Sequence, residues 1–188
     1  MPVELADIWL PIALSGVFVF VVSSILHMCI PIHKGDYKKL PDEEQVLAAL
    51  REHDLKPGEY MFPCAGSMKE MSDPAMVAKY EQGPVGFMAV FPTGSPAMGK
   101  SLVQWFLYSI LIGFCVGYLG TQVLEKGAEF KDVFRFTGTV AIVVYGFSCI
   151  PNSIWKGAGW ISTAKYIFDG VLYGFATALA FALMWPAA

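Results

Sequence analysis

Four long apolar runs restrict the folds that this chain can adopt more than any other feature of the sequence. The runs are Ile8 to Ile30, Leu102 to Leu124, Val133 to Ile154 and Tyr166 to Trp185. A helix needs roughly 20 mostly apolar residues to cross a hydrocarbon core of about 30 Å, and each run is long enough. The chain is 55% hydrophobic with a mean hydropathy of +0.52. It is therefore predicted to be an all-α integral membrane protein with four transmembrane helices.

The runs divide the chain into three parts: a first transmembrane helix (1–30), a polar and interfacial insert (31–101) and a three-helix transmembrane bundle (102–188). In the insert, the acids after Pro41 and the cap signal Ser72-Asp73-Pro74 each precede a short one-sided helix. The runs Tyr60-Met61-Phe62 and Gly86 to Phe91 are candidate strands that could pair. The expected insert is thus a small mixed α/β unit.

Lysine positions favour one orientation of the spans, because basic residues near span ends tend to stay in the cytoplasm. Nothing basic precedes the first span. The basic residues that follow the first span or precede the second include Lys34, Lys38, Lys39 and Lys100. This pattern predicts a cytoplasmic insert and two extracytoplasmic termini, although Lys126, Lys131 and Arg135 on the opposite side dilute the bias.

Two runs carry small residues at every fourth position. The last run has Gly170, Gly174, Ala178 and Ala182, and the second has the GxxxG pair Gly113 and Gly117. In a helix this spacing produces a smooth stripe against which another helix can pack closely. The packing helix is expected either in this chain, where the two stripes could meet, or in another membrane protein.

A candidate intramembrane polar site comprises Asp169, Lys165 and Asn152. Acids inside spans are costly and suggest function by default. Lys165 precedes Asp169 by four residues, which predicts an ion pair on one helix face. A helix that begins near Tyr166 would place Asp169 roughly 5 Å from its start, close to the membrane surface. That depth favours a structural role over transport or proton handling.

Weak candidates for metal ligands lie at the end of the first span: His27, Cys29 and, past Pro31, His33. Imidazole and thiol ligands suit zinc or copper. Positions 27 and 29 point about 200° apart on a helix, so only a chain reversal at Pro31 could make the ligands converge. An ordinary interfacial histidine is the favoured interpretation.

The sequence indicates no catalytic residue and no cofactor. A phosphate-binding loop, a nucleophile elbow and an HExxH helix are all missing, and haem would find at most one axial histidine, His27. The sulfur-rich stretch from Met61 to Met71 is typical of packing surfaces. No basic stripe indicates nucleic acid. The expected partners are membrane lipid and either another membrane protein or further copies of the chain.

Several strings resemble an uncharacterised family of small bacterial multi-pass membrane proteins. They are Leu55-Lys56-Pro57-Gly58-Glu59-Tyr60-Met61-Phe62-Pro63, Asn152-Ser153-Ile154-Trp155, Asp169-Gly170 and Trp185-Pro186. The resemblance extends along most of the chain. It implies a location in the bacterial inner membrane, and it implies no activity and no site residues.

Three functional hypotheses follow. The first is a non-catalytic membrane subunit that packs with other membrane proteins or with itself, in an accessory role. The second is a small oligomeric transporter or channel that uses Asp169 together with the polar span residues Gln104, Gln122 and Asn152. The third is a metal or redox protein that uses His27, Cys29 and His33.

Overall fold

The computed structural model describes residues 1–188 and contains four helical segments long and apolar enough to cross a membrane. These are Leu5–Cys29, Met98–Thr121, Phe130–Trp155 and Trp160–Met184. Large apolar side chains on their outer surfaces, such as Leu107, are exposed, as is expected where lipid surrounds a helix. The prediction of four such helices is confirmed, and the fold is consistent with a multi-pass membrane protein.

The first span ends in an irregular turn followed by a reversal. A 3₁₀ turn, η1 (Leu5–Ile8), leads into α1 (Trp9–Ser24), which continues as a π-helical turn, η2 (Ile25–Cys29). A second 3₁₀ turn, η3 (Pro31–His33), follows at once. Proline cannot continue the backbone hydrogen bonds of a helix. The chain therefore turns back beside the bundle here instead of extending away from it.

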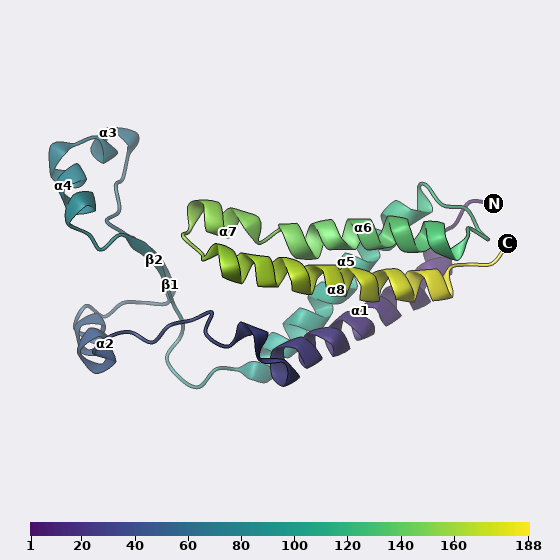
Figure 1. The fold of residues 1–188 in the computed structure, drawn as a ribbon, viewed down its shortest axis with the longest axis horizontal. Helices are drawn as coiled ribbons and strands as arrows, with labels where there is room; N and C mark the ends of the chain where they lie inside the picture. Colours follow the sequence, from purple (N-terminus) through teal and green to yellow (C-terminus); the bar gives the residue numbers. More distant parts are fainter.

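The remaining spans form two helix pairs. They consist of α5 (Met98–Thr121), α6 (Phe130–Phe147) with its short continuation α7 (Ile150–Trp155), and α8 (Trp160–Met184). Helices α1 and α5 run together, as do α6 and α8, and the two pairs diverge with distance from the chain termini (Figure 1). The end at which they diverge is the end that carries the insert.

The small-residue stripe of α8 packs against α6. A Cβ atom added to Gly170 would overlap the backbone of Gly146, and one added to Gly138 would lie 3.0 Å from Ala178 Cβ. Such close approach between backbones requires small residues on both helices. The helix opposite the α8 stripe therefore belongs to the same chain.

The GxxxG pair of α5 packs against the first span. A Cβ atom on Gly113 would overlap the Ser15 hydroxyl, and one on Gly117 would lie 2.8 Å from Ile8 Cδ1. Phe181 of α8 also contacts Gly117, since a Cβ there would lie 3.1 Å from its ring. The two predicted stripes thus pack against different helices and do not meet each other.

The insert contains three short helices and a two-stranded antiparallel sheet, with two of the helices between the strands in the chain. Its elements are α2 (Glu43–Glu52), β1 (Gly58–Phe62), α3 (Met68–Met71), α4 (Pro74–Gln82) and β2 (Gly86–Val90). The strands pair antiparallel, with Gly58 opposite Val90. The Asp73 carboxylate accepts from the Ala75 N–H at 2.8 Å and caps α4, as the cap signal predicts. Helix α3 was not predicted, and the insert projects away from the bundle (Figure 1).

The opposite end of the bundle joins both termini to the α5–α6 loop. The Lys126 N–H donates to the Met1 carbonyl at 2.9 Å, and the Gly127 N–H donates to the Pro186 carbonyl at 2.8 Å. The Lys126 ammonium also lies 2.7 Å from the Asp7 carboxylate. This end is closed by hydrogen bonds, whereas the insert end opens between the helix pairs.

Candidate metal centre

Asp169 lies deeper in its helix than the apolar run predicts. Helix α8 begins at Trp160, so Asp169 is about 14 Å from the start of the helix at 1.5 Å per residue. Its side chain is only 2% exposed. The apolar run thus leaves out the first turns of α8, because residues 160–165, although more polar, continue the same helix.

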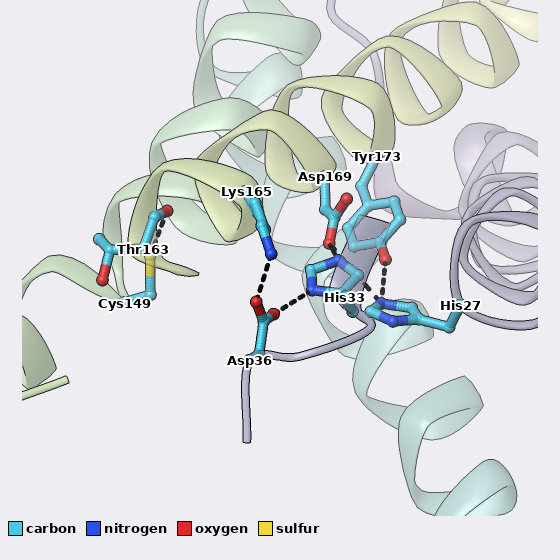
Figure 2. Close-up of polar contacts among 8 residues, drawn as sticks. All are labelled: His27, His33, Asp36, Cys149, Thr163, Lys165, Asp169 and Tyr173. Carbon is cyan, nitrogen blue, oxygen red and sulfur yellow. Dashed lines mark hydrogen bonds and ion pairs between the residues drawn. The ribbon is translucent and has the colours of Figure 1, made fainter. Parts of the chain in front are cut away.

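Two histidines lie at this carboxylate: His27 at the end of the first span and His33, which the reversal at Pro31 brings back to it. His33 Nε2 lies 2.7 Å from Asp169 Oδ2, and His27 Nε2 lies 3.7 Å from the same oxygen. The two imidazole rings stack with their centroids 4.5 Å apart. Figure 2 shows both rings beside Asp169, one from the end of the first span and one from the turn that follows it. Three residues distant in sequence therefore converge at one point.

Cys29 does not join this cluster. Its side chain is exposed, whereas His27 faces Asp169. Two positions of separation on a helical turn explain the difference. Among the weak metal candidates from the sequence, the structure thus brings His27 and His33 together with an acid and leaves Cys29 outside.

Behind His33 lies an ion pair that fixes the ring. His33 Nδ1 is 2.7 Å from Asp36 Oδ2, and the Lys165 ammonium donates to Asp36 Oδ1 at 2.5 Å (Figure 2). The Lys165 bond, and then the His33 bond, hold the pKa of Asp36 below its ordinary value. Lys165 consequently pairs with Asp36, and the expected ion pair between Lys165 and Asp169 is absent.

The contacts of His33 determine whether its Nε2 atom bears a proton or is free to bind a cation. Carboxylate oxygens lie 2.7 Å from both ring nitrogens, and an ionised carboxylate can only accept a hydrogen bond. His33 can donate to both carboxylates only as an imidazolium. Alternatively, Nδ1–H donates to Asp36 while Nε2, without a proton, binds a cation together with Asp169. Histidine ligands to metals commonly have such a carboxylate behind them.

The spacing of the ligand atoms suits a metal ion after small adjustments. Nitrogen and oxygen ligands lie about 2.0–2.2 Å from Zn²⁺, so two of them are at most about 4.4 Å apart. The distances of 2.7 Å and 3.7 Å to Asp169 Oδ2 satisfy this limit. All three ligand atoms lie within 4.8 Å of one another. At tetrahedral angles two such ligands lie roughly 3.3–3.6 Å apart, so metal binding would require the 2.7 Å hydrogen bond between His33 Nε2 and Asp169 Oδ2 to open by about 0.6 Å or more.

A cavity of about 650 Å³ lies beside the cluster, between the diverging helix pairs. Asp169, His27 and Tyr173 line part of it. Asp169 Oδ1 is buried and has no hydrogen-bond partner, and the Tyr173 hydroxyl lies 3.2 Å from His27 Nε2. A buried carboxylate oxygen without a partner is costly, and a cation bound to both carboxylate oxygens would reduce that cost.

The other polar residues predicted in the spans lie elsewhere. Gln104, Gln122 and Asn152 are exposed, and none lines the cavity. Asn152 lies in α7 and is not part of the group around Asp169 and Lys165. The predicted packing residues of α5 and α8 serve helix contacts inside the bundle, as described above.

Asp36 and Tyr173 are part of the site and were not identified from the sequence. Asp36 follows His33 by three residues, and Tyr173 follows Asp169 by four, so each shares a turn or a helix face with a residue that was identified. These spacings are the only signal that could have revealed them. Neither spacing shows that His33 and Asp36 lie next to Asp169 and Tyr173, because that contact depends on the reversal at Pro31.

Comparison of the chain with protein-family models, with curated proteins and with solved structures found no match. The interpretation of the site therefore rests on its geometry.

Proposed function

We propose that this chain is an integral membrane metal-binding protein that holds one divalent transition-metal ion at His27, His33 and Asp169. The observation that carries the proposal is the unpartnered, buried Oδ1 of Asp169 beside two converging imidazoles. A buried carboxylate in these surroundings costs free energy unless it binds a cation. The Asp36–Lys165 pair supports the proposal because it orients His33 toward Asp169.

Two imidazoles and one carboxylate form a borderline donor set that suits Fe²⁺ and Zn²⁺. Sites with three protein ligands leave coordination positions for water or a further ligand, in contrast to structural sites with four. Here Asp169 and His27 both line the cavity. The proposed centre is therefore one that a small molecule can reach.

Metal titration of the purified protein tests this proposal. The chain, stripped of metal and held in detergent, is expected to bind one Zn²⁺ or one Fe²⁺ with saturation. Asp169→Asn and His33→Ala are each expected to weaken binding by more than the roughly 10–100-fold typical for loss of a residue behind a metal ligand.

The third histidine of the chain supplies the matched control. His53 is exposed at the end of α2 and lies outside the cluster, so His53→Ala should leave metal affinity unchanged. Circular dichroism and gel filtration would verify that each variant remains folded. Equal affinity in the wild type and in a folded Asp169→Asn variant would contradict the proposal.

The proposed location is the bacterial inner membrane, with the insert in the cytoplasm and both termini outside. Lysines that flank the insert support this orientation. In this arrangement the metal cluster lies toward the cytoplasmic end of the spans. A reducing cytoplasm would keep Fe²⁺ reduced and agrees with four free cysteines.

An accessory role in a membrane complex is a second proposal, and the surface of the insert favours it. Within residues 31–101 only Met76 is a buried hydrophobic residue, while Phe62, Phe87 and Phe91 are exposed. Apolar surface of this kind favours association. Purification in mild detergent should retain a partner protein or additional copies of the chain. Recovery of a lone monomer would contradict this role.

A further inference from the structure

Tyr173 places a second oxygen beside a ligand atom of the proposed metal centre. It follows Asp169 by four residues in α8, so the two side chains share a face of that helix. The Tyr173 hydroxyl lies 3.2 Å from His27 Nε2 (Figure 2). It is therefore closer to this nitrogen than Asp169 Oδ2, which lies 3.7 Å away.

The separation between the Tyr173 hydroxyl and His27 Nε2 fits two atoms that bind one ion. Ligand atoms about 2.0–2.2 Å from a metal lie about 2.8–3.1 Å apart at right angles and about 3.3–3.6 Å apart at tetrahedral angles. The observed 3.2 Å falls between these two ranges. Unlike His33 and Asp169, these two groups need not move apart to bind the same ion.

Metal binding at His27 changes the surroundings of the Tyr173 hydroxyl. The hydroxyl can donate to His27 Nε2 only when that nitrogen carries no proton, and the same form of the ring binds a metal. An ion that took the lone pair of Nε2 would leave the hydroxyl without this acceptor. Because Tyr173 is only 5% exposed, that loss costs free energy. Binding of the phenolic oxygen to the ion avoids the cost, and three protein ligands leave a coordination position for it.

The charge of the ligand set determines which ion a phenolate oxygen suits. Two neutral imidazoles and the Asp169 carboxylate bring one negative charge, so a divalent ion leaves one positive charge at the centre and a trivalent ion leaves two. Unbalanced charge is costly in a buried site. Loss of the Tyr173 proton adds a second negative charge and gives a trivalent ion the same net charge as the divalent centre. Tyrosine is a known ligand of haem iron, whereas the usual zinc ligands are cysteine, histidine and carboxylates.

We infer that the centre also binds Fe³⁺ and that the Tyr173 phenolate is then its fourth protein ligand, beside the three already proposed. In this step the phenolic O–H bond breaks, an O–Fe bond forms and the proton leaves to solvent, so the oxidation state of the iron does not change. The inference rests on the proposed function, since it uses the same two histidines and Asp169. It adds a ligand and identifies the ion for which that ligand matters.

Spectroscopic titration of the full-length protein in detergent tests this inference. The chain, stripped of metal, is titrated with Fe³⁺ supplied as its nitrilotriacetate complex. Binding of one Fe³⁺ per chain is expected to produce a visible phenolate-to-iron charge-transfer band whose resonance Raman spectrum contains tyrosine ring modes. Tyr173→Phe removes only the hydroxyl and should abolish the band. The matched control Tyr108→Phe, in the wall of the same cavity, should retain it.

A Zn²⁺ titration of the same variants separates the role of Tyr173 from the proposed function. Tyr173→Phe keeps all three ligands for a divalent ion. Its Zn²⁺ affinity should therefore fall by no more than about 5-fold, the effect of one lost hydrogen bond, and this binding would also show that the variant is folded. Asp169→Asn should lose both Zn²⁺ binding and the ferric band.

Two results would overturn the role of Tyr173 and leave the proposed function intact. One is a wild-type protein that binds Zn²⁺ and develops no ferric band, a result that requires no variant. The other is a ferric band that persists in Tyr173→Phe. A wild-type protein that binds neither ion would overturn both the inference and the proposed function.

Discussion

Asp36 stabilises the geometry of the candidate metal centre without being one of its ligands. Its carboxylate is 4% exposed and lies between the Lys165 ammonium and His33 Nδ1. Through these bonds, Asp36 keeps the Nε2 atom of His33 directed at Asp169. The importance of this residue comes from its two partners, which belong to different parts of the chain.

Asp36→Asn is expected to lower Zn²⁺ affinity by about 10–100-fold, because the carboxamide holds the imidazole less strongly and no longer pairs with Lys165. A competition titration with a chromophoric chelator measures the change. Asp54→Asn is the matched control, since Asp54 pairs with Lys56 on the exposed surface of the insert. An unchanged affinity in Asp36→Asn would mean that His33 is oriented by other contacts.

The composition of the site could be predicted only in part from its residues. His27, His33 and Asp169 were each identified individually, because histidines at a span end and an acid within a span are rare and costly. Their association was not predicted, since 136 positions separate His33 from Asp169. Lys165 was assigned to the wrong acid because helical spacing describes neighbours on one helix and cannot reveal a loop that docks against it.

At the scale of elements, the contact between α6 and α8 depends on glycine. A methyl group at Gly170 would meet the backbone of Gly146, which has no flexible side chain to yield. Overpacking of this kind costs about 1–3 kcal/mol. Because Asp169 directly precedes this contact, a displaced α8 would also disturb the cluster.

Gly170→Ala is therefore expected to lower the free energy of unfolding by about 1–3 kcal/mol and to weaken metal binding. Thermal unfolding in detergent, followed by circular dichroism, measures the first effect. Gly99→Ala is the matched control: Gly99 lies in the first turns of α5 with no neighbour near an added Cβ. Equal melting temperatures for both variants would show that α6 and α8 can accommodate the added methyl group without loss of stability.

The elements themselves were largely predictable, and their ends were not. Apolar runs located the four long helices because burial in lipid selects for apolar residues over a full span. The start of α8 was missed since Ser162, Thr163 and Lys165 reduce the hydropathy while remaining helical. Thr163 and Ser153 of α7 form a buried hydroxyl pair there. Hydropathy therefore identifies the part of a helix that contacts lipid. It does not identify polar turns that extend the same helix through hydrogen bonds.

At the scale of the whole molecule, the proposed orientation places the insert and the two termini on opposite sides of the membrane. Cys64 is exposed in the insert. When the other cysteines are changed to serine, labelling of Cys64 shows on which side of the membrane the insert lies. A membrane-impermeant maleimide should label Cys64 in inside-out vesicles and not in spheroplasts. The reciprocal control is Ala188→Cys in a chain without other cysteines, which should show the opposite pattern. Labelling of Cys64 in spheroplasts would reverse the orientation.

The two connections between insert and bundle differ in kind. The chain leaves the bundle through His33 and Asp36, which side-chain contacts hold to Asp169 and Lys165. It returns at Met98 as a continuous backbone into α5, without a side-chain cap at Ala97. Side chains as well as backbone hold the first connection to the bundle, whereas backbone alone forms the second. A charge change at Asp169 would therefore act on the insert through the first connection, while the exposed Lys156–Glu59 ion pair links β1 to the bundle independently of Asp169.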